Sequence, residues 1–175
     1  MIKTHKYTVC DSVKSIQAGV EALSKSPFLI LDCEGKNLGG IGGALSLICI
    51  GTARAERIFI FDALALHKAK RATQDLWNLL NDAKVIKYMW DGRMDAMELL
   101  ETGVRLQGVM DLQIVEVASR LTNRRESNQA RLKRLALRLP KSIVYDADRS
   151  AGLHLVLGMQ GCLKAMGIAL KKDRG

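Results

Sequence analysis

The chain has 175 residues, of which 48% are hydrophobic and 26% charged, with a formal net charge of +9. These values are typical of a folded domain and exclude an intrinsically disordered chain. The longest apolar runs, such as 45–50, are the length of a strand, which excludes a membrane-spanning helix. No apolar stretch follows the basic start of the chain, so a secretory signal is not predicted. We therefore expect an intracellular protein, of the cytoplasm or the nucleus, that does not enter a membrane.

The four cysteines and three histidines show no ligand spacing. There is no C-x-x-C pair and no H-x-x-x-H pair, so neither a zinc site nor a disulfide framework is predicted. The cysteines are expected to act mainly as small hydrophobic residues.

The first elements are expected before residue 27. Apolar residues at helical spacing predict a helix over 12–24, with Asp11 or Ser12 as its N-cap, and Pro27 prevents much continuation. Tyr7 and the residues after it are interpreted as a strand that ends in this cap.

Two acidic residues follow a buried strand. The segment FLILDCEG, residues 28–35, is predicted to be a strand that carries Asp32 and Glu34 at its C-terminal end. The glycine-rich connector 35–43 after it matches neither the dinucleotide-binding pattern nor the Walker pattern. We interpret it as a turn.

The rest of the chain alternates strands and helices. The patterns predict strands 44–52 and 57–64 as a hairpin, helix 72–82, strand 84–90, helix 94–103 closed by Gly103, a short strand 109–110 and helix 111–121. This order favours an α/β fold with a mixed sheet flanked by helices, in a single domain over residues 1–175.

Positive charge is concentrated in the second part of the chain. Residues 101–175 carry 14 basic and 7 acidic side chains, and the tract Arg120–Lys141 holds eight basic residues and one acid, Glu126. This tract is either a solvated helix face or a surface that binds the phosphate backbone of a nucleic acid, for which the planar arginine fork is suited. The candidate nucleic-acid contacts in it are Arg120, Arg124, Arg125, Arg131, Lys133, Arg134 and Arg138.

Three acids are expected to meet at one edge of the sheet. Asp32 and Glu34 are two residues apart on a strand, so their side chains point to the same face. Asp95 lies early in a helix that follows a strand, which places it at the carboxyl edge of a parallel sheet. Three such oxygen donors favour Mg²⁺ or Mn²⁺ over zinc. The alternative is that D-x-E is a structural pair held by hydrogen-bond donors.

Several segments in the same order resemble a known family. LDCEG, NLGGIGGALSLICIGT, IFIFDAL, KYMWDGRMDAMELL and GVMDLQIVEVASR look like the DEDD 3′–5′ exonuclease superfamily, in its ribonuclease D-like branch. The resemblance runs from about Tyr7 to Gly167. It implies a ribonuclease H-like fold and two-metal removal of nucleotides from a 3′ end.

The resemblance also assigns roles to residues. Asp32 and Glu34 match the first motif, whose acids hold the catalytic metal, and Asp95 matches the second. Asp111 matches a position that looks structural, as the N-cap of the next helix. Arg93 is a candidate contact to the scissile phosphate, and a salt bridge from Arg93 to Asp91 or Asp95 is the alternative.

The chain departs from the family at the third motif, which is Tyr or His, three residues, then Asp. Here Tyr145 is followed four residues later by Arg149, and His154 by Gly158. We expect the family's last helix to be missing, so that a substitute acid such as Asp148 would have to complete the site. An apolar sheet face left open would favour a homodimer or a protein partner that covers it.

Two functional hypotheses follow. The first is a metal-dependent 3′–5′ exonuclease acting on RNA or single-stranded DNA, with activity impaired because the fourth acidic ligand is missing. The second is a catalytically inactive nucleic-acid-binding or scaffold module with the same fold. The family resemblance favours the enzyme, and the lack of a fourth acidic ligand favours the module.

Overall fold

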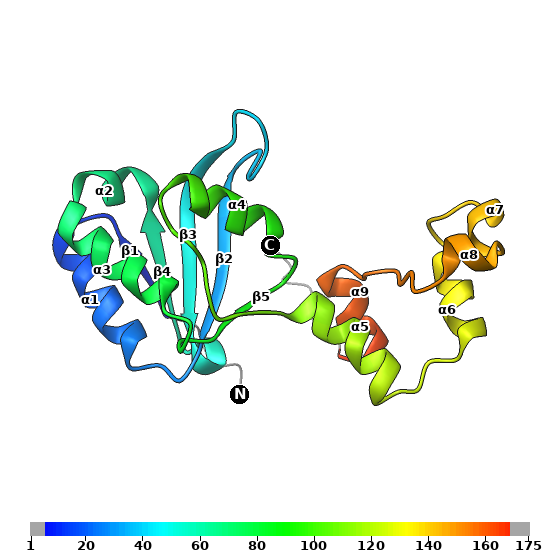
Figure 1. Ribbon diagram of the computed structural model, residues 1–175. Coiled ribbons are helices and arrows are strands. Elements are labelled where there is room, and N and C mark those ends of the chain that lie inside the picture. Colours follow the sequence, from blue (N-terminus) through cyan, green and yellow to red (C-terminus); the bar gives the residue numbers. More distant parts are fainter. Residues whose placement is uncertain (1–5, 169–175) are drawn as a thin grey trace, which may run out of the picture. The chain divides into compact units, whose positions relative to one another are not determined.

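The computed structural model describes residues 6–168, whose strands form one six-stranded sheet (Figure 1). The order of strands across the sheet is β1-β4-β3-β2-β5-β6. The strands are β1 Lys6–Cys10, β2 Leu29–Lys36, β3 Ala44–Thr52, β4 Arg57–Asp62, β5 Lys87–Met89 and β6 Val109–Asp111.

The sheet is mixed, as the sequence predicts. Strand β3 is antiparallel to both β2 and β4, which confirms the hairpin, whereas β1 is parallel to β4 and β5 is parallel to β2 and β6. Because β2 and β5 run in the same direction, their carboxyl ends lie at the same edge of the sheet. Asp32 and Glu34 lie in the second half of β2, and Asp95 follows β5, so the three acids come from neighbouring parallel strands.

Contacts within the chain group it into two units, Met1–Asp111 and Leu112–Gly175. In the first unit, α1 and α3 pack against each other beside the sheet (Figure 1). The helices of this unit are α1 Val13–Ser24, α2 Ala63–Lys68, α3 Lys70–Asn81 and α4 Arg93–Glu101.

Strand alternation separates a buried face of the sheet from an exposed one. On β2, Leu29, Leu31 and Cys33 belong to the hydrophobic core that also includes Phe59 and Phe61 of β4. The intervening β2 residues point to the other face. On that other face the side chains of Tyr7, Val9 and Ile30 are 64%, 57% and 39% exposed.

Helix starts follow the predicted capping chemistry where a small polar residue is present. Ser12 is the N-cap of α1 and forms a reciprocal capping box with Ser15. The expected strand 57–64 ends two residues early because Asp62 caps α2, its carboxylate accepting a 2.8 Å hydrogen bond from the Leu64 amide. Helix α2 was therefore missed by the sequence analysis.

The second unit is helical. It contains α5 Leu112–Thr122, α6 Asn128–Leu135, α7 Lys141–Val144, α8 Ala147–Ser150 and α9 Met159–Ala165. In residues 6–168, no helix has the length and apolar character needed to cross a membrane.

A buried lysine at the start of β5 forms hydrogen bonds with two loops. Lys87 of β5 is 0% exposed, and its Nζ donates hydrogen bonds to the carbonyl oxygens of Asp82, at 2.6 Å, and Gln107, at 2.9 Å. Burial disfavours the ammonium and lowers the pKa of Lys87 from 10.5 to about 8, against the opposing charge of Asp82. The two carbonyl groups keep the buried side chain hydrogen-bonded.

We predict that Lys87 makes stability depend on pH between about 8 and 10.5. In this window the folded chain has released the Lys87 proton while the unfolded chain still holds it, so the free energy of unfolding rises with pH. Relative to Lys87→Met, the wild type should gain up to about 3 kcal/mol across the window, measured by urea unfolding. If the difference in free energy of unfolding between the wild type and Lys87→Met stayed constant with pH, this prediction would be wrong. Lys84→Met, at an exposed lysine, is the control for the loss of one positive charge.

Candidate active site at the end of β2

Strand β2 presents two carboxylates on one face. Asp32 and Glu34 are exposed, whereas Leu31 and Cys33 between and beside them are buried in the core. The alternation predicted from the sequence is therefore present, and both acids lie on the same side of the strand.

Helix α4 brings a third carboxylate to the backbone between them. Asp95 lies in the first turn of α4 and is 8% exposed. Its Oδ1 accepts a 2.9 Å hydrogen bond from the backbone N–H of Cys33. A carboxylate near a helix N-terminus is also stabilised by the helix dipole. The third predicted acid thus contacts the residue that separates the other two.

The pKa of Asp32 is affected by the two neighbouring carboxylates. Burial, followed by the charges of Asp95 and Glu34, raises the pKa of Asp32, and a hydrogen bond from the Cys33 backbone partly opposes the rise. The three carboxylates therefore repel one another. A divalent cation bound among them would offset the repulsion.

The donor chemistry at this edge fits a hard divalent cation, because all three candidate ligands are carboxylates. Among residues 6–168, however, no group of three His, Cys, Asp or Glu side chains already has the spacing of a metal site. Asp32, Glu34 and Asp95 lie near one another without forming a ready-made coordination shell.

A second link between α4 and β2 was missed by the sequence analysis. Glu98 is 7% exposed, and its Oε2 accepts a 2.9 Å hydrogen bond from the backbone N–H of Gly39, in the loop after β2. Gly39 has a φ of 64°, and a Cβ there would lie 2.8 Å from the Met94 carbonyl oxygen. The only sequence signal was that Glu98 follows Asp95 by three residues, on the same side of the helix.

The other charged residues near the site interact with one another at the turn after β5. Arg93 forms a 2.7 Å ion pair with Asp91, which is the alternative that the sequence left open, and its side chain is 75% exposed. The carboxylate of Asp111 accepts a 3.1 Å hydrogen bond from the Asp91 backbone. Asp111 therefore supports this turn, and its expected role as the N-cap of the next helix stays a prediction.

The structure corrects the expectation for Arg120. Its side chain is 2% exposed, forms ion pairs with Glu116 at 3.0 Å and Glu126 at 3.7 Å, and donates a 2.6 Å hydrogen bond to the Leu155 carbonyl. A buried guanidinium already bound to two carboxylates is not available to a phosphate. Arg120 is a structural residue of the second unit.

Three other arginines of the basic tract also have protein partners. Arg124 pairs with Glu116 at 2.7 Å, and Arg134 pairs with Glu126 at 2.9 Å. Arg131 donates hydrogen bonds to the carbonyl oxygens of Ser150 and Leu153. The candidate contacts that remain exposed, with no ion pair to another described residue, are Arg125, Lys133 and Arg138.

Comparison with known proteins identifies the family of the chain. A family model described as 3′–5′ exonuclease matches residues 7–151, which run from the first unit into the second. No curated protein matches the chain.

Solved structures show the same fold. A ribonuclease D from Trypanosoma brucei, in complex with GMP, has 28% identity and a TM-score of 0.57, over 63% of this chain and 34% of that one. The same protein with RNA U12 has 22% identity and a TM-score of 0.57, over 86% and 59%. Ribonuclease D from Escherichia coli has 19% identity and a TM-score of 0.55, over 94% and 41%.

These likenesses confirm the α/β, ribonuclease H-like fold that the sequence resemblance implied. The chain spans about one-third to three-fifths of the length of these neighbours, from 34% to 59%.

We predict that Arg120→Met lowers the free energy of unfolding by about 1–3 kcal/mol, because Glu116 and Glu126 lose their shared buried cation and keep only Arg124 and Arg134 as partners. Urea titration followed by far-ultraviolet circular dichroism measures the loss. The exposed Arg125→Met is the matched control and should change stability by no more than about 0.5 kcal/mol. Equal stability of the two variants would show that the ion-pair cluster does not hold this unit together.

Proposed function

Because the chain belongs to the 3′–5′ exonuclease family, we propose that it removes nucleotides from the 3′ end of a nucleic-acid strand by metal-dependent hydrolysis. The observation that carries this proposal is the contact of Asp95 with the Cys33 backbone, between Asp32 and Glu34. This contact supports the proposal because it joins Asp95 to the strand that carries the other two acids assigned by the resemblance.

Asp32, Glu34 and Asp95 are the proposed ligands of Mg²⁺ or Mn²⁺, and the family generally uses divalent metals. The bound cation supplies positive charge that stabilises the charge developing on the scissile phosphate. The Cys33 N–H orients the Asp95 carboxylate through its 2.9 Å hydrogen bond. Glu98 holds α4 in place through the Gly39 amide.

Turnover is proposed to be slow. Within residues 112–175, no Tyr or His is followed four residues later by Asp, so these residues do not supply the third family motif. Losing one acidic ligand and the residue that positions the attacking water weakens the whole catalytic unit, because its members act together.

The proposed substrate is single-stranded, with RNA tested first and DNA second. The ribonuclease D structure at 28% identity contains GMP, which motivates RNA. Arg93, at the turn beside the acids, is the proposed contact to the scissile phosphate, and its 75% exposed side chain leaves it accessible to a strand.

Arg125, Lys133 and Arg138 are the proposed backbone contacts of the second unit. A homodimer or a protein partner is a further proposal, supported by the exposed Tyr7, Val9 and Ile30 on one sheet face.

Cleavage is the direct test. With 5′-labelled single-stranded RNA and Mn²⁺, the wild type should shorten the strand stepwise from its 3′ end, and Asp32→Asn should reduce the rate at least about 100-fold. Asp75→Asn, an exposed acid on α3, is the matched control and should retain the rate. Binding without cleavage by the wild type would overturn the enzyme and leave the inactive nucleic-acid-binding module.

Metal binding has a separate test that does not require activity. Mn²⁺ should raise the melting temperature of the wild type, because an ion that binds only the folded state stabilises it. Asp32→Asn should lose this rise and Asp75→Asn should keep it. The same response in all three proteins would remove Asp32 from the metal site.

A further inference from the structure

A cavity of about 690 Å³ lies among α2, α3 and α4 in the first unit. This volume is within the range of small-molecule sites. Leu45, Leu64 and Trp77 provide apolar and aromatic walls, and Asp32, Glu34 and Asp95 do not line it. The cavity is therefore separate from the proposed metal site.

The polar groups that line the cavity fall into two sets. Each side chain of the first set already forms a hydrogen bond within the protein. The pairs are Thr73 with the Leu66 carbonyl, Gln74 with Asn78, Glu98 with the Gly39 amide, and Thr102 with the Leu99 carbonyl. The second set, His67, Lys70 and Glu101, is exposed and makes no hydrogen bond or ion pair with another residue that the structure describes. Only the second set is free to bind a ligand.

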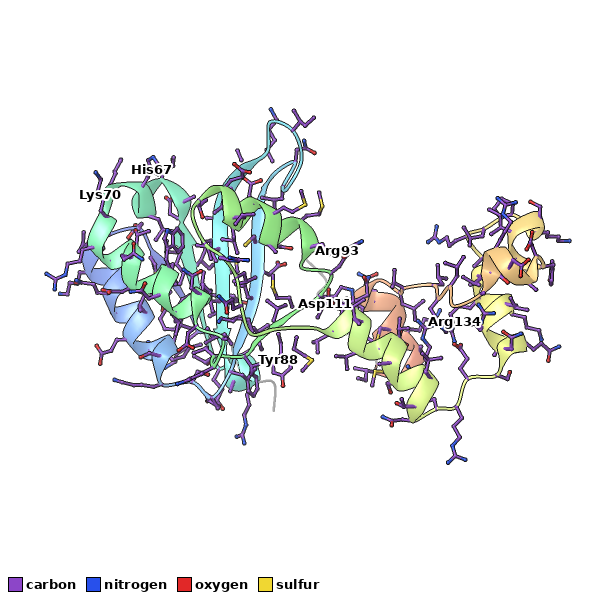
Figure 2. All side chains as sticks on the ribbon, in the orientation of Figure 1. His67, Lys70, Tyr88, Arg93, Asp111 and Arg134 are labelled. Carbon is purple, nitrogen blue, oxygen red and sulfur yellow. The ribbon has the colours of Figure 1, made fainter. Side chains whose placement is uncertain are left out.

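Helix stability does not explain the position of Lys70, whereas His67 lies in the last turn of α2, where a basic residue is favourable. Figure 2 shows His67 and Lys70 at the corner where α2 meets α3. Lys70 is the first residue of α3, whose N-cap Ala69 provides no side-chain hydrogen bond and whose first turn contains no acid. A cation at a helix N-terminus opposes the helix dipole. An anionic group between His67 and Lys70 would compensate this arrangement.

The free groups define the chemistry of a ligand. His67 and Lys70 suit a phosphate, and the indole of Trp77 suits a planar aromatic ring. Glu101, which comes from α4, is an acceptor for N–H groups at the edge of that ring. Guanine presents two adjacent N–H donors to a carboxylate, whereas uracil presents one.

We propose that this cavity binds a nucleoside monophosphate, with its phosphate at His67 and Lys70, its base against Trp77 and a preference for guanine set by Glu101. A nucleoside monophosphate is the product of the hydrolysis proposed above, so the biological supply of the ligand rests on the proposed function. The binding itself does not depend on the metal site.

Trp77 provides a direct reporter. The chain has two tryptophans, and the buried indole N–H of Trp90 has no hydrogen-bond partner among the described residues 6–168. Trp90→Phe therefore removes an unsatisfied group and leaves Trp77 as the single tryptophan. Guanosine 5′-monophosphate, added to the full chain with this change in the presence of EDTA, should quench Trp77 fluorescence with saturation. Uridine 5′-monophosphate and guanosine, which lacks the phosphate, should bind more weakly.

Variants in the same background test each contact. Lys70→Gln should raise the dissociation constant for guanosine 5′-monophosphate roughly tenfold, because a charge-assisted hydrogen bond to phosphate is lost. Lys68→Gln is the matched control, since Lys68 is exposed on α2 and does not line the cavity. Glu101→Gln should weaken binding of the guanine nucleotide, which loses a two-donor contact, more than it weakens binding of the uracil nucleotide. Melting curves of each variant without ligand establish that it is folded.

The outcomes separate this proposal from the enzymatic one. Absence of saturable quenching, or equal affinity of Lys70→Gln and Lys68→Gln, would overturn the nucleotide site whatever the cleavage assay shows. Equal affinity for the guanine and uracil nucleotides would overturn the role of Glu101. Quenching that persists in Asp32→Asn would support a site independent of the metal ligands. If the nucleotide binds but RNA is not cleaved, the proposed function fails and the binding site stands.

Discussion

The hydrogen bond from the Cys33 amide to the Asp95 carboxylate joins two residues that are 62 positions apart in the chain. It connects α4 to β2 at the residue between Asp32 and Glu34, so the position of the third acid is set by the backbone that carries the other two. The cost is a concentration of partly buried negative charge: burial first, and then the charges of Asp95 and Glu34, raise the pKa of Asp32. The contact therefore positions three carboxylates whose mutual repulsion a bound cation would offset.

The sequence predicted the parts of the site that follow from strand periodicity and from parallel pairing. Asp32 and Glu34 share a face because side chains alternate along β2, and Asp95 is nearby because β2 and β5 are parallel neighbours. The distances between the three carboxylates could not be predicted in this way. Among the described residues no cluster is already arranged for a metal, and strand periodicity and pairing fix which face a residue is on but not the conformation of its side chain.

The basic tract shows where charge counting fails. Eight basic residues with one acid indicated a surface for phosphate, but the partner Glu116 lies four residues before Arg120, outside the tract. Glu116 and Glu126 bind Arg120, Arg124 and Arg134, so part of the positive charge holds the helices of the second unit together. Helix α2 was not predicted because the sequence around Asp62 is ambiguous: an aspartate there is compatible with the end of an apolar strand and with the N-cap of a helix.

Helix α4 carries three acids on successive turns, and each has a different neighbour. Asp95 is bonded to β2, Glu98 to the glycine loop, and Glu101 lines the cavity beside α2 and α3. Since the three acids lie on one face of a single helix, a substitution that unfolds α4 would remove the support of the acidic edge, of the glycine loop and of the cavity wall together.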